Sequence, residues 1–212
     1  MRLLVFDTET TGLPKFRSPA IEGANNWPHI VSISWIVLET DTNTEITRKN
    51  FLVKPRNWII PPESTAVHGI THAHAMEHGL DLEYVLHTFL NEPCDAWVAH
   101  NLEFDMNVVI HGYIWDLRHV HTPIPARKYC TMKLGRIVCG VDKYPKLTEL
   151  YAYTFGCPPP NPSMLHTSMY DVEILVDILR TSYALRDRMF GLRATNVLSP
   201  YAVHKGNVLH IT

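Results

Sequence analysis

Alternating apolar and polar stretches along the chain predict strands first, followed by pairs of strand and helix. The opening run at 3–6 is wholly apolar and is followed by a Gly-Pro turn signal, which predicts a strand buried on both faces. Two more strands are expected at 30–39 and 46–54, joined by a polar turn that makes a hairpin. The short apolar run at 96–99 predicts a fourth, buried strand.

Helical spacing of apolar residues dominates the rest of the chain. The expected helices are a short turn and five longer segments, at 63–67, 81–90, 101–115, 131–138, 146–155 and 168–189. Residues 13–29 contain several Gly and Pro residues and predict a loop. Strands followed by alternating strand and helix favour an α/β sandwich around a mixed sheet.

Length and composition favour one globular domain. The chain has 212 residues, of which 46% are hydrophobic and 19% charged, and this is enough to bury a full core. We expect a single domain over 1–190 and a C-terminal tail of unknown role at 191–212, where periodicity is weak. No apolar stretch is long enough to span a bilayer, and Asp7 interrupts the opening run too early for a signal peptide.

Cysteine spacing and charge bear on the location of the protein and on its binding partners. The four cysteines lack CxxC spacing, so we expect reduced thiols in a soluble intracellular protein of the cytoplasm or nucleus, with no membrane partner. The net charge of −2 gives no global argument for nucleic acid, but residues 127–146 carry six basic side chains and one acidic side chain. This segment would hold phosphates or form a solvated surface, and the sequence leaves both interpretations open.

Two carboxylates, Asp7 and Glu9, follow the opening apolar run. Side chains on a strand alternate faces, so these two point the same way, with Cα atoms about 6.5 Å apart. Burial and mutual repulsion would drive one of them to take up a proton unless a cation compensates. A bound divalent metal, solvation at the strand end and pairing with Arg or Lys each satisfy this constraint.

Two further acidic residues occur where a scaffold can present polar groups to a cleft. Asp105 falls in the first helical turn after the strand at 96–99, and Asp171 begins the last long helix, five residues after His166. Ser168-x-x-Asp171 also fits a capping box, in which the carboxylate would only satisfy backbone N–H groups. Taken alone, Asp171 is open to both interpretations.

Three motifs follow one another along the chain: Asp7-x-Glu9, His100-Asn101-x-x-Phe104-Asp105 and His166-x4-Asp171. Together with the connecting segments TETTGLP, IPPESTAVHGIT and KLTELYAYTFG, they resemble the DnaQ-like DEDDh 3′–5′ exonucleases over residues 2–185. This resemblance implies an α/β fold of the ribonuclease H-like class, with a five-stranded mixed sheet flanked by helices.

The resemblance implies a catalytic centre with two divalent metal ions, Mg²⁺ or Mn²⁺. Asp7, Glu9 and Asp171 would hold the ion beside the attacking water. Asp7 would also bridge to the second ion, which Asp105 would support partly through water. His166 would take the proton from the water as general base, since imidazole titrates near neutrality.

The resemblance also implies contacts with the 3′-terminal nucleotide of a substrate. The residues expected to make them are Thr10, Thr11, Leu13, His68, Ile70, Asn101 and Phe104. Leu13 would wedge against the bases, because apolar side chains can stack on bases without reading sequence. Ordinary core packing is the alternative for Leu13, Ile70 and Phe104.

Several features bear on how closely the chain follows the family pattern. Thr167 stands where the tyrosine subclass would have Tyr, which indicates the histidine subclass. The proline-rich stretch at 157–162 would stiffen the loop that carries His166 or act as a spacer. His100 is interpreted as a hydrogen-bonded residue at a strand end. No cysteine or regular ligand pair accompanies the histidines at 68, 72, 74 and 78, so zinc is not expected there.

The leading hypothesis is a metal-dependent 3′–5′ exonuclease that releases 5′-mononucleotides from single-stranded or frayed DNA ends. The alternatives are an RNA 3′–5′ exonuclease and a catalytically silent nucleic-acid-binding domain. DNA is preferred because TETTGLP and His-Gly-Ile-Thr look more like the proofreading and repair members than the oligoribonuclease branch. The expected partners are DNA or RNA 3′ ends and a separate polymerase or repair complex, although a freestanding repair or degradation enzyme fits equally well.

Overall fold

A five-stranded sheet forms the centre of the molecule. The computed structural model describes residues 1–120 and 124–191, and its strands are β1 (Arg2–Thr10), β2 (Ile30–Glu39), β3 (Thr44–Leu52), β4 (Ala96–Ala99) and β5 (Arg127–Cys130). Their order in the sheet is β3-β2-β1-β4-β5. β2 pairs antiparallel with β1 and β3, whereas β4 pairs parallel with β1 and β5. The prediction of a five-stranded mixed sheet is confirmed.

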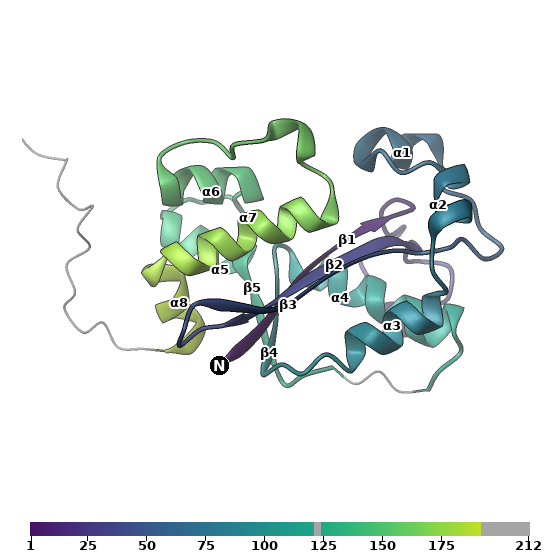
Figure 1. Ribbon diagram of the computed structural model, residues 1–212, viewed down its shortest axis with the longest axis horizontal. Helices are drawn as coiled ribbons and strands as arrows, with labels where there is room; N and C mark the ends of the chain where they lie inside the picture. The colour runs from purple at the N-terminus through teal and green to yellow at the C-terminus, as the bar shows by residue number, and fades with distance from the viewer. Residues whose placement is uncertain (121–123, 192–212) are drawn as a thin grey trace, which may run out of the picture.

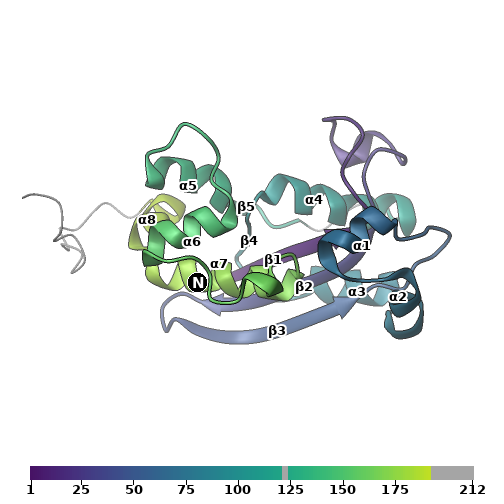
Figure 2. The same ribbon diagram turned by 90° about the horizontal axis from the view of Figure 1, so that it is seen from above.

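Helices cover both faces of this sheet (Figure 1). In the described ranges they are α1 (Pro62–His68), α2 (His72–His78), α3 (Leu82–Leu90), α4 (Leu102–His111), α5 (Thr131–Cys139), α6 (Leu147–Phe155), α7 (Ser168–Thr181) and α8 (Tyr183–Phe190). Shorter turns are η1 (Ala20–Glu22), the π turn η2 (Gly112–Asp116) and η3 (Pro162–Met164). Figure 2 shows α5 to α8 gathered at one end and α1 to α3 at the other. No helix in the described chain has the length and apolar character needed to cross a membrane.

Two apolar cores, one on each face of the sheet, explain why β1 opens without polar alternation. Leu3 and Val5 pack with residues of α6, α7 and α8, while Leu4 and Phe6 pack with residues of α3 and α4. All four side chains are fully buried. A strand covered on both faces is wholly apolar where both cores contact it, as the sequence predicts. The carboxylates of β1 follow at its C-terminal end, beyond these cores.

The observed elements depart from the sequence prediction at several places. β5 is half basic in sequence, and its pairing with β4 identifies it as a strand. α2 lies in a histidine-rich segment without a clear apolar stripe, so periodicity does not predict it. The helix predicted at 168–189 is two helices, because the backbone breaks at Ser182, whose side chain caps α8. The predicted tail lies outside the described residues beyond Gly191.

A buried hydroxyl network joins the start of α7 to β2. The Ser168 Oγ lies 3.0 Å from the Ser32 Oγ and 2.7 Å from the Ser34 Oγ. Ser34 also donates a hydrogen bond to the Asn50 Oδ1 at 2.9 Å. Ser168 therefore bonds to β2, and α7 has no side-chain bond at its N-cap, so the capping-box interpretation of Ser168-x-x-Asp171 is wrong. The network holds the first turn of α7, which carries Asp171, against the sheet.

We expect Ser168→Ala to lower the free energy of unfolding by about 1–2 kcal/mol, because the substitution leaves the buried Ser32 hydroxyl without its partner. Urea denaturation followed by circular dichroism measures this change. Ser163→Ala removes an exposed hydroxyl from η3 and is the matched control, with an expected change within about 0.5 kcal/mol. Equal stabilities of the two variants would show that the network contributes nothing.

Candidate active site

Three carboxylates converge where the C-terminal end of β1 meets the first turn of α7. Asp7 and Glu9 lie opposite Ser34 and Ser32 of β2, as their alternation along β1 predicts. Asp171 comes from α7, which packs across β1 and β2 (Figure 1). Each of the three acids offers one carboxylate oxygen, and these oxygens all lie within 4.8 Å of one another. Residues more than 160 positions apart in the chain thus form one cluster.

A fourth carboxylate, Asp105, is held beside this cluster by β1. Its Oδ1 accepts hydrogen bonds from the Thr8 N–H at 3.1 Å and the Thr8 hydroxyl at 2.7 Å. The Asp105 side chain is 3% exposed and comes from the first turn of α4. Thr8 was not among the predicted site residues. Its position between Asp7 and Glu9, where a strand side chain must face the other way, is the signal that could have identified it.

Burial raises the pKa of every carboxyl in the cluster, and repulsion by neighbouring acids adds to the shift of Asp7, Glu9 and Asp105. Burial, followed by the charges of the other three acids, holds the pKa of Asp7 well above its usual range. Burial and the charges of Asp171 and Asp105 raise the pKa of Glu9 to about 8. Burial raises the pKa of Asp105 to about 7, although the Thr8 hydrogen bonds oppose this shift. Burial also raises the pKa of Asp171 to about 6.

The donor set fits hard divalent cations. The Asp171 Oδ1 is buried and lacks a hydrogen-bond partner among the described residues, although a carboxylate oxygen is a strong acceptor. Within residues 1–120 and 124–191, no Lys or Arg forms an ion pair with any of the four acids. Pairing with Arg or Lys, which the sequence left open, is therefore wrong for this cluster. Carboxylate oxygens without a cationic partner are the ligands that Mg²⁺ and Mn²⁺ prefer.

His166 lies next to the cluster on an exposed loop. Its backbone has a left-handed conformation with φ of 64°, directly before α7. The charge and the backbone of His166 act to lower the pKa of Asp171, which indicates that the two residues are neighbours. The loop is held by the Thr167 hydroxyl, which donates to the Met164 carbonyl at 2.7 Å. The Asn161 N–H also donates to the Tyr170 hydroxyl at 2.9 Å, so the proline-rich stretch is anchored to α7.

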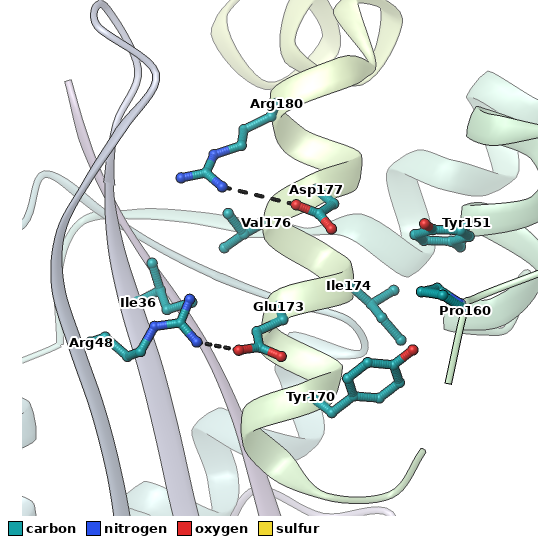
Figure 3. Close-up of a pocket in the computed structure, with 10 residues that line it drawn as sticks. All are labelled: Ile36, Arg48, Tyr151, Pro160, Tyr170, Glu173, Ile174, Val176, Asp177 and Arg180. Carbon is teal, nitrogen blue, oxygen red and sulfur yellow. Dashed lines mark hydrogen bonds and ion pairs between the residues drawn. The ribbon is translucent and has the colours of Figure 1, made fainter. Parts of the chain in front are cut away.

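A hollow on the flank of α7 is separate from the acidic cluster. Its walls come from β2, β3, α6, α7 and the proline-rich stretch, and none of the predicted site residues lines it. Figure 3 shows Arg48 turned toward Glu173 and Arg180 turned toward Asp177, so its charged side chains pair within the hollow. The Arg48–Glu173 pair joins β3 to α7, which is typical of a structural contact, whereas the Arg180–Asp177 pair lies within α7.

The predicted substrate residues after β1 form a stiff turn with an exposed tip. The Thr10 hydroxyl donates to the Gly12 carbonyl at 2.7 Å. Thr11 is bound to His29 twice, through its N–H to the His29 carbonyl at 3.0 Å and through its hydroxyl, which accepts from the His29 N–H at 3.0 Å. Leu13 is 81% exposed, so core packing, the alternative for this residue, is wrong.

His68 and Ile70 lie at the end of α1. The His68 Nδ1 accepts a hydrogen bond from the Ile70 N–H at 3.1 Å, so a neutral ring carries its proton on Nε2. That Nε2 is buried without a partner, and burial lowers the pKa of His68 while the Thr10 backbone opposes the shift. His68 therefore directs its Nε2 proton toward the Thr10 backbone at the end of β1. Ile70 packs partly against a small apolar cluster with Ile60, as the packing alternative predicts.

Asn101 and Phe104 begin α4 on the other side of the strand end. Asn101 occupies the N-cap with a left-handed φ of 75°, but its exposed side chain makes no capping bond. Phe104 is partly buried, with its ring centroid 5.8 Å from that of Trp27, which the sequence did not single out. The His100 Nε2 lies 2.9 Å from the Pro145 carbonyl and its Nδ1 3.2 Å from the Thr131 hydroxyl. His100 is a hydrogen-bonded residue at a strand end, as predicted.

Comparison with known proteins gives a consistent picture. The chain matches a family model described as exonuclease, RNase_T, over residues 4–179. It is 27% identical over 184 residues to exodeoxyribonuclease 10 of Escherichia coli strain K12, covering 85% of this chain and 70% of that protein. The structure of exonuclease X in complex with 5′ overhanging duplex DNA superposes with a TM-score of 0.58 at 27% identity, covering 85% of this chain and 92% of that one.

A more distant likeness shows the same fold. The structure of E. coli exonuclease I in complex with a dT13 oligonucleotide superposes with a TM-score of 0.65 at 18% identity, covering 90% of this chain and 42% of that one. The matched family model begins in β1 and ends in α7, so it includes all four acids and part or all of every strand. The chain therefore belongs to the exonuclease family, and the prediction of a DnaQ-like 3′–5′ exonuclease is confirmed at the level of family, fold and reaction class.

Proposed function

We propose that the protein removes 5′-mononucleotides from the 3′ ends of single-stranded or frayed DNA with the help of two divalent metal ions, Mg²⁺ or Mn²⁺. The observation that carries this proposal is the convergence of Asp7, Glu9 and Asp171 within 4.8 Å, with Asp105 buried beside them. DNA is favoured over RNA because two relatives with 27% identity are exodeoxyribonuclease 10 and exonuclease X, and the structure of the latter is a complex with DNA. A separate polymerase or repair complex as partner stays a prediction.

The positions of the acids and of His166 support the roles that the family resemblance implies. Asp7, Glu9 and Asp171 would hold one ion, and Asp7 together with Asp105 would hold the other. Bound divalent ions stabilise the charge that develops on the phosphoryl oxygens and on the attacking and leaving oxygens. His166 would accept the proton of the attacking water on a ring nitrogen, since its loop places an exposed imidazole beside Asp171.

The residues around the strand end suit a terminal nucleotide. Leu13 supplies an exposed apolar side chain, and the partly buried Phe104 directly precedes Asp105 in the first turn of α4. Within the described residues the exposed Asn101 side chain makes no capping bond, and the His68 Nε2 proton lies near the Thr10 backbone. Apolar faces that stack on bases and a few free donors would bind a strand end with little preference for sequence.

Basic residues of β5 and α5 would contact the phosphate backbone of the strand. Arg127, Lys128 and Arg136 are exposed and form no ion pair with a described residue. Lys133 and Lys143 are paired with acidic neighbours at 2.9 Å and 2.5 Å. Part of the basic segment is therefore available for phosphates, and part is neutralised on the surface.

Asp7→Asn is expected to lower the rate of 3′ shortening by at least about 100-fold, because it removes a charge shared by both proposed ions. The assay follows 5′-labelled single-stranded DNA and RNA of matched sequence with Mg²⁺, Mn²⁺ or EDTA. Glu77→Gln, which changes an exposed acid of α2, is the control and should retain wild-type activity. Intact label in the wild-type lanes, or equal rates for both variants, would contradict the proposal. Faster loss of the RNA would reassign the substrate.

Without metal, the protein is expected to become less stable as pH rises from about 4 to about 8. Glu9 and Asp105 have raised pKa values of about 8 and about 7, so the folded chain holds protons that the unfolded chain releases above about pH 4. Stability is thus greatest below the unfolded pKa values and falls as pH rises through the folded ones. Melting temperatures in EDTA measure this slope, and Mg²⁺ should restore stability most at the high-pH end. Asp7→Asn removes one of the carboxyls with a raised pKa and should flatten this slope. Equal slopes in the variant and the wild type would contradict the prediction.

His166→Ala is expected to lower kcat by about 100-fold to 10,000-fold through loss of the proton acceptor. The stabilisation of the fold by Mg²⁺ should stay close to that of the wild type, because His166 is not a proposed ligand. His87→Ala removes an exposed imidazole from α3 and serves as the matched control. The decisive readout is the rise of kcat with pH, which should persist in the control and disappear in His166→Ala. If the rise persisted in both, another group would be the base.

A further inference from the structure

A second group of metal-ligating side chains lies behind the turn that follows β1. It consists of His29, just before β2, His111, the last residue of α4, and Asp116, the end of the π turn η2. One donor atom of each residue lies within 4.8 Å of the other two. The Asp116 Oδ2 lies 2.9 Å from the His29 Nδ1 and 3.8 Å from the His111 Nδ1.

His111 presents a bare ring nitrogen to this group. Its Nε2 lies 2.8 Å from the Ala24 carbonyl, which can only accept, so the Nε2 carries the proton. In the neutral ring Nδ1 is then a lone pair. His111 is 1% exposed, and its Nδ1 is buried without a hydrogen-bond partner in residues 1–120 and 124–191. A histidine whose far nitrogen donates to a backbone carbonyl has the arrangement typical of a metal ligand.

Hydrogen bonds alone leave the His111 Nδ1 without a partner. The His111 Nδ1 and the Asp116 Oδ2 are both acceptors, and they face each other at a distance too long for a hydrogen bond. A proton on His29 Nδ1 satisfies Asp116 on one side and leaves His111 unsatisfied. A cation between the three atoms satisfies all of them, with the His29 proton carried on Nε2 instead.

The surroundings of the group fix its ligands and leave it accessible. The His29 ring stacks on Trp58 with centroids 5.0 Å apart and an angle of 3° between the planes. Asp116 and His29 both line hollows on two sides of the group, so an ion has a path inward. Lys54 and Arg118 line one of these hollows, yet the ion-pair contacts of Asp116 within the described chain are with the two histidines.

We propose that His29, His111 and Asp116 form a transition-metal site, suited to Zn²⁺, that is distinct from the carboxylate cluster. Two imidazoles and one carboxylate form the donor set that Zn²⁺ takes with a fourth position open to water, whereas Mg²⁺ prefers oxygen ligands. His111 follows Asp105 by six residues on α4, which is a rise of about 9 Å, so one ion cannot serve both sites.

The expected role of this site is to stiffen the turn that the substrate would contact. Thr11 is bound to His29 by two hydrogen bonds, so an ion on His29 fixes the segment leading to Leu13. His111 and Asp116 anchor that segment to the end of α4. The histidine-rich stretch of α2, which was weighed for zinc on sequence, supplies none of these ligands.

Titration of the metal-free full chain with Co²⁺, a coloured substitute for Zn²⁺, tests this site directly. We expect visible d–d bands that saturate at about one equivalent and are displaced by Zn²⁺, since an ion with nitrogen ligands and low coordination number absorbs strongly. Asp116→Asn should weaken binding by at least about 10-fold, and His29→Gln should do the same. These two residues are partly exposed, so their variants avoid the core, unlike any change of His111.

Two control variants test whether the Co²⁺ bands come from this site or from the histidines of α2 or the carboxylate cluster. The double variant His74→Ala and His78→Ala removes two histidine rings of α2 that lie beside each other. It should keep the Co²⁺ bands. Asp7→Asn disrupts the carboxylate cluster and should also keep them, with the Zn²⁺-induced rise in melting temperature intact. Absence of bands in the wild type, bands unaffected in Asp116→Asn and His29→Gln, or bands lost in Asp7→Asn would each overturn the proposal.

Discussion

The repulsion among carboxylates at the end of β1 is the constraint on which the rest of the active-site structure depends. Asp7 and Glu9 are placed there by a strand whose preceding residues are fixed by two apolar cores, so they cannot move apart. Asp105 and Asp171 arrive from opposite sides on two helices. Folding therefore builds an unfavourable charge cluster, and the stability of the two cores must offset it until a cation is bound.

Short hydroxyl side chains are what allow the helices to approach this cluster. Thr8 meets Asp105 from α4, and Ser32 and Ser34 meet Ser168 from α7. A larger apolar side chain at any of these positions would hold a helix away from the sheet and leave a buried polar group without a partner. The sequence between and opposite the acids is thus as much a part of the site as the acids are.

Local patterns predicted most of the sheet, because burial and alternation act over a few residues, whereas the four acids were joined into one site only by the ordered motifs of the family resemblance. The apolar runs at 3–6 and 96–99 predict buried strands, and both are observed as strands. β5 escaped prediction because its strand character comes from pairing with β4, and α2 because its histidines form no apolar stripe. The break at Ser182 is a local capping event inside a continuous apolar pattern, which periodicity cannot detect.

Contacts between distant segments account for what the sequence did not reveal of the sites. Thr8 has a local signal, but nothing near His29 in the sequence points to His111 and Asp116, which join it only in the folded chain. α4 connects the two clusters, because its first turn carries Asp105 and its last residue is His111. A rigid helix with one end at each cluster couples the position of the catalytic acids to the turn that precedes Leu13. An ion at the far end of α4 would therefore act on the substrate contacts by holding the helix and the turn together, without touching the reacting atoms.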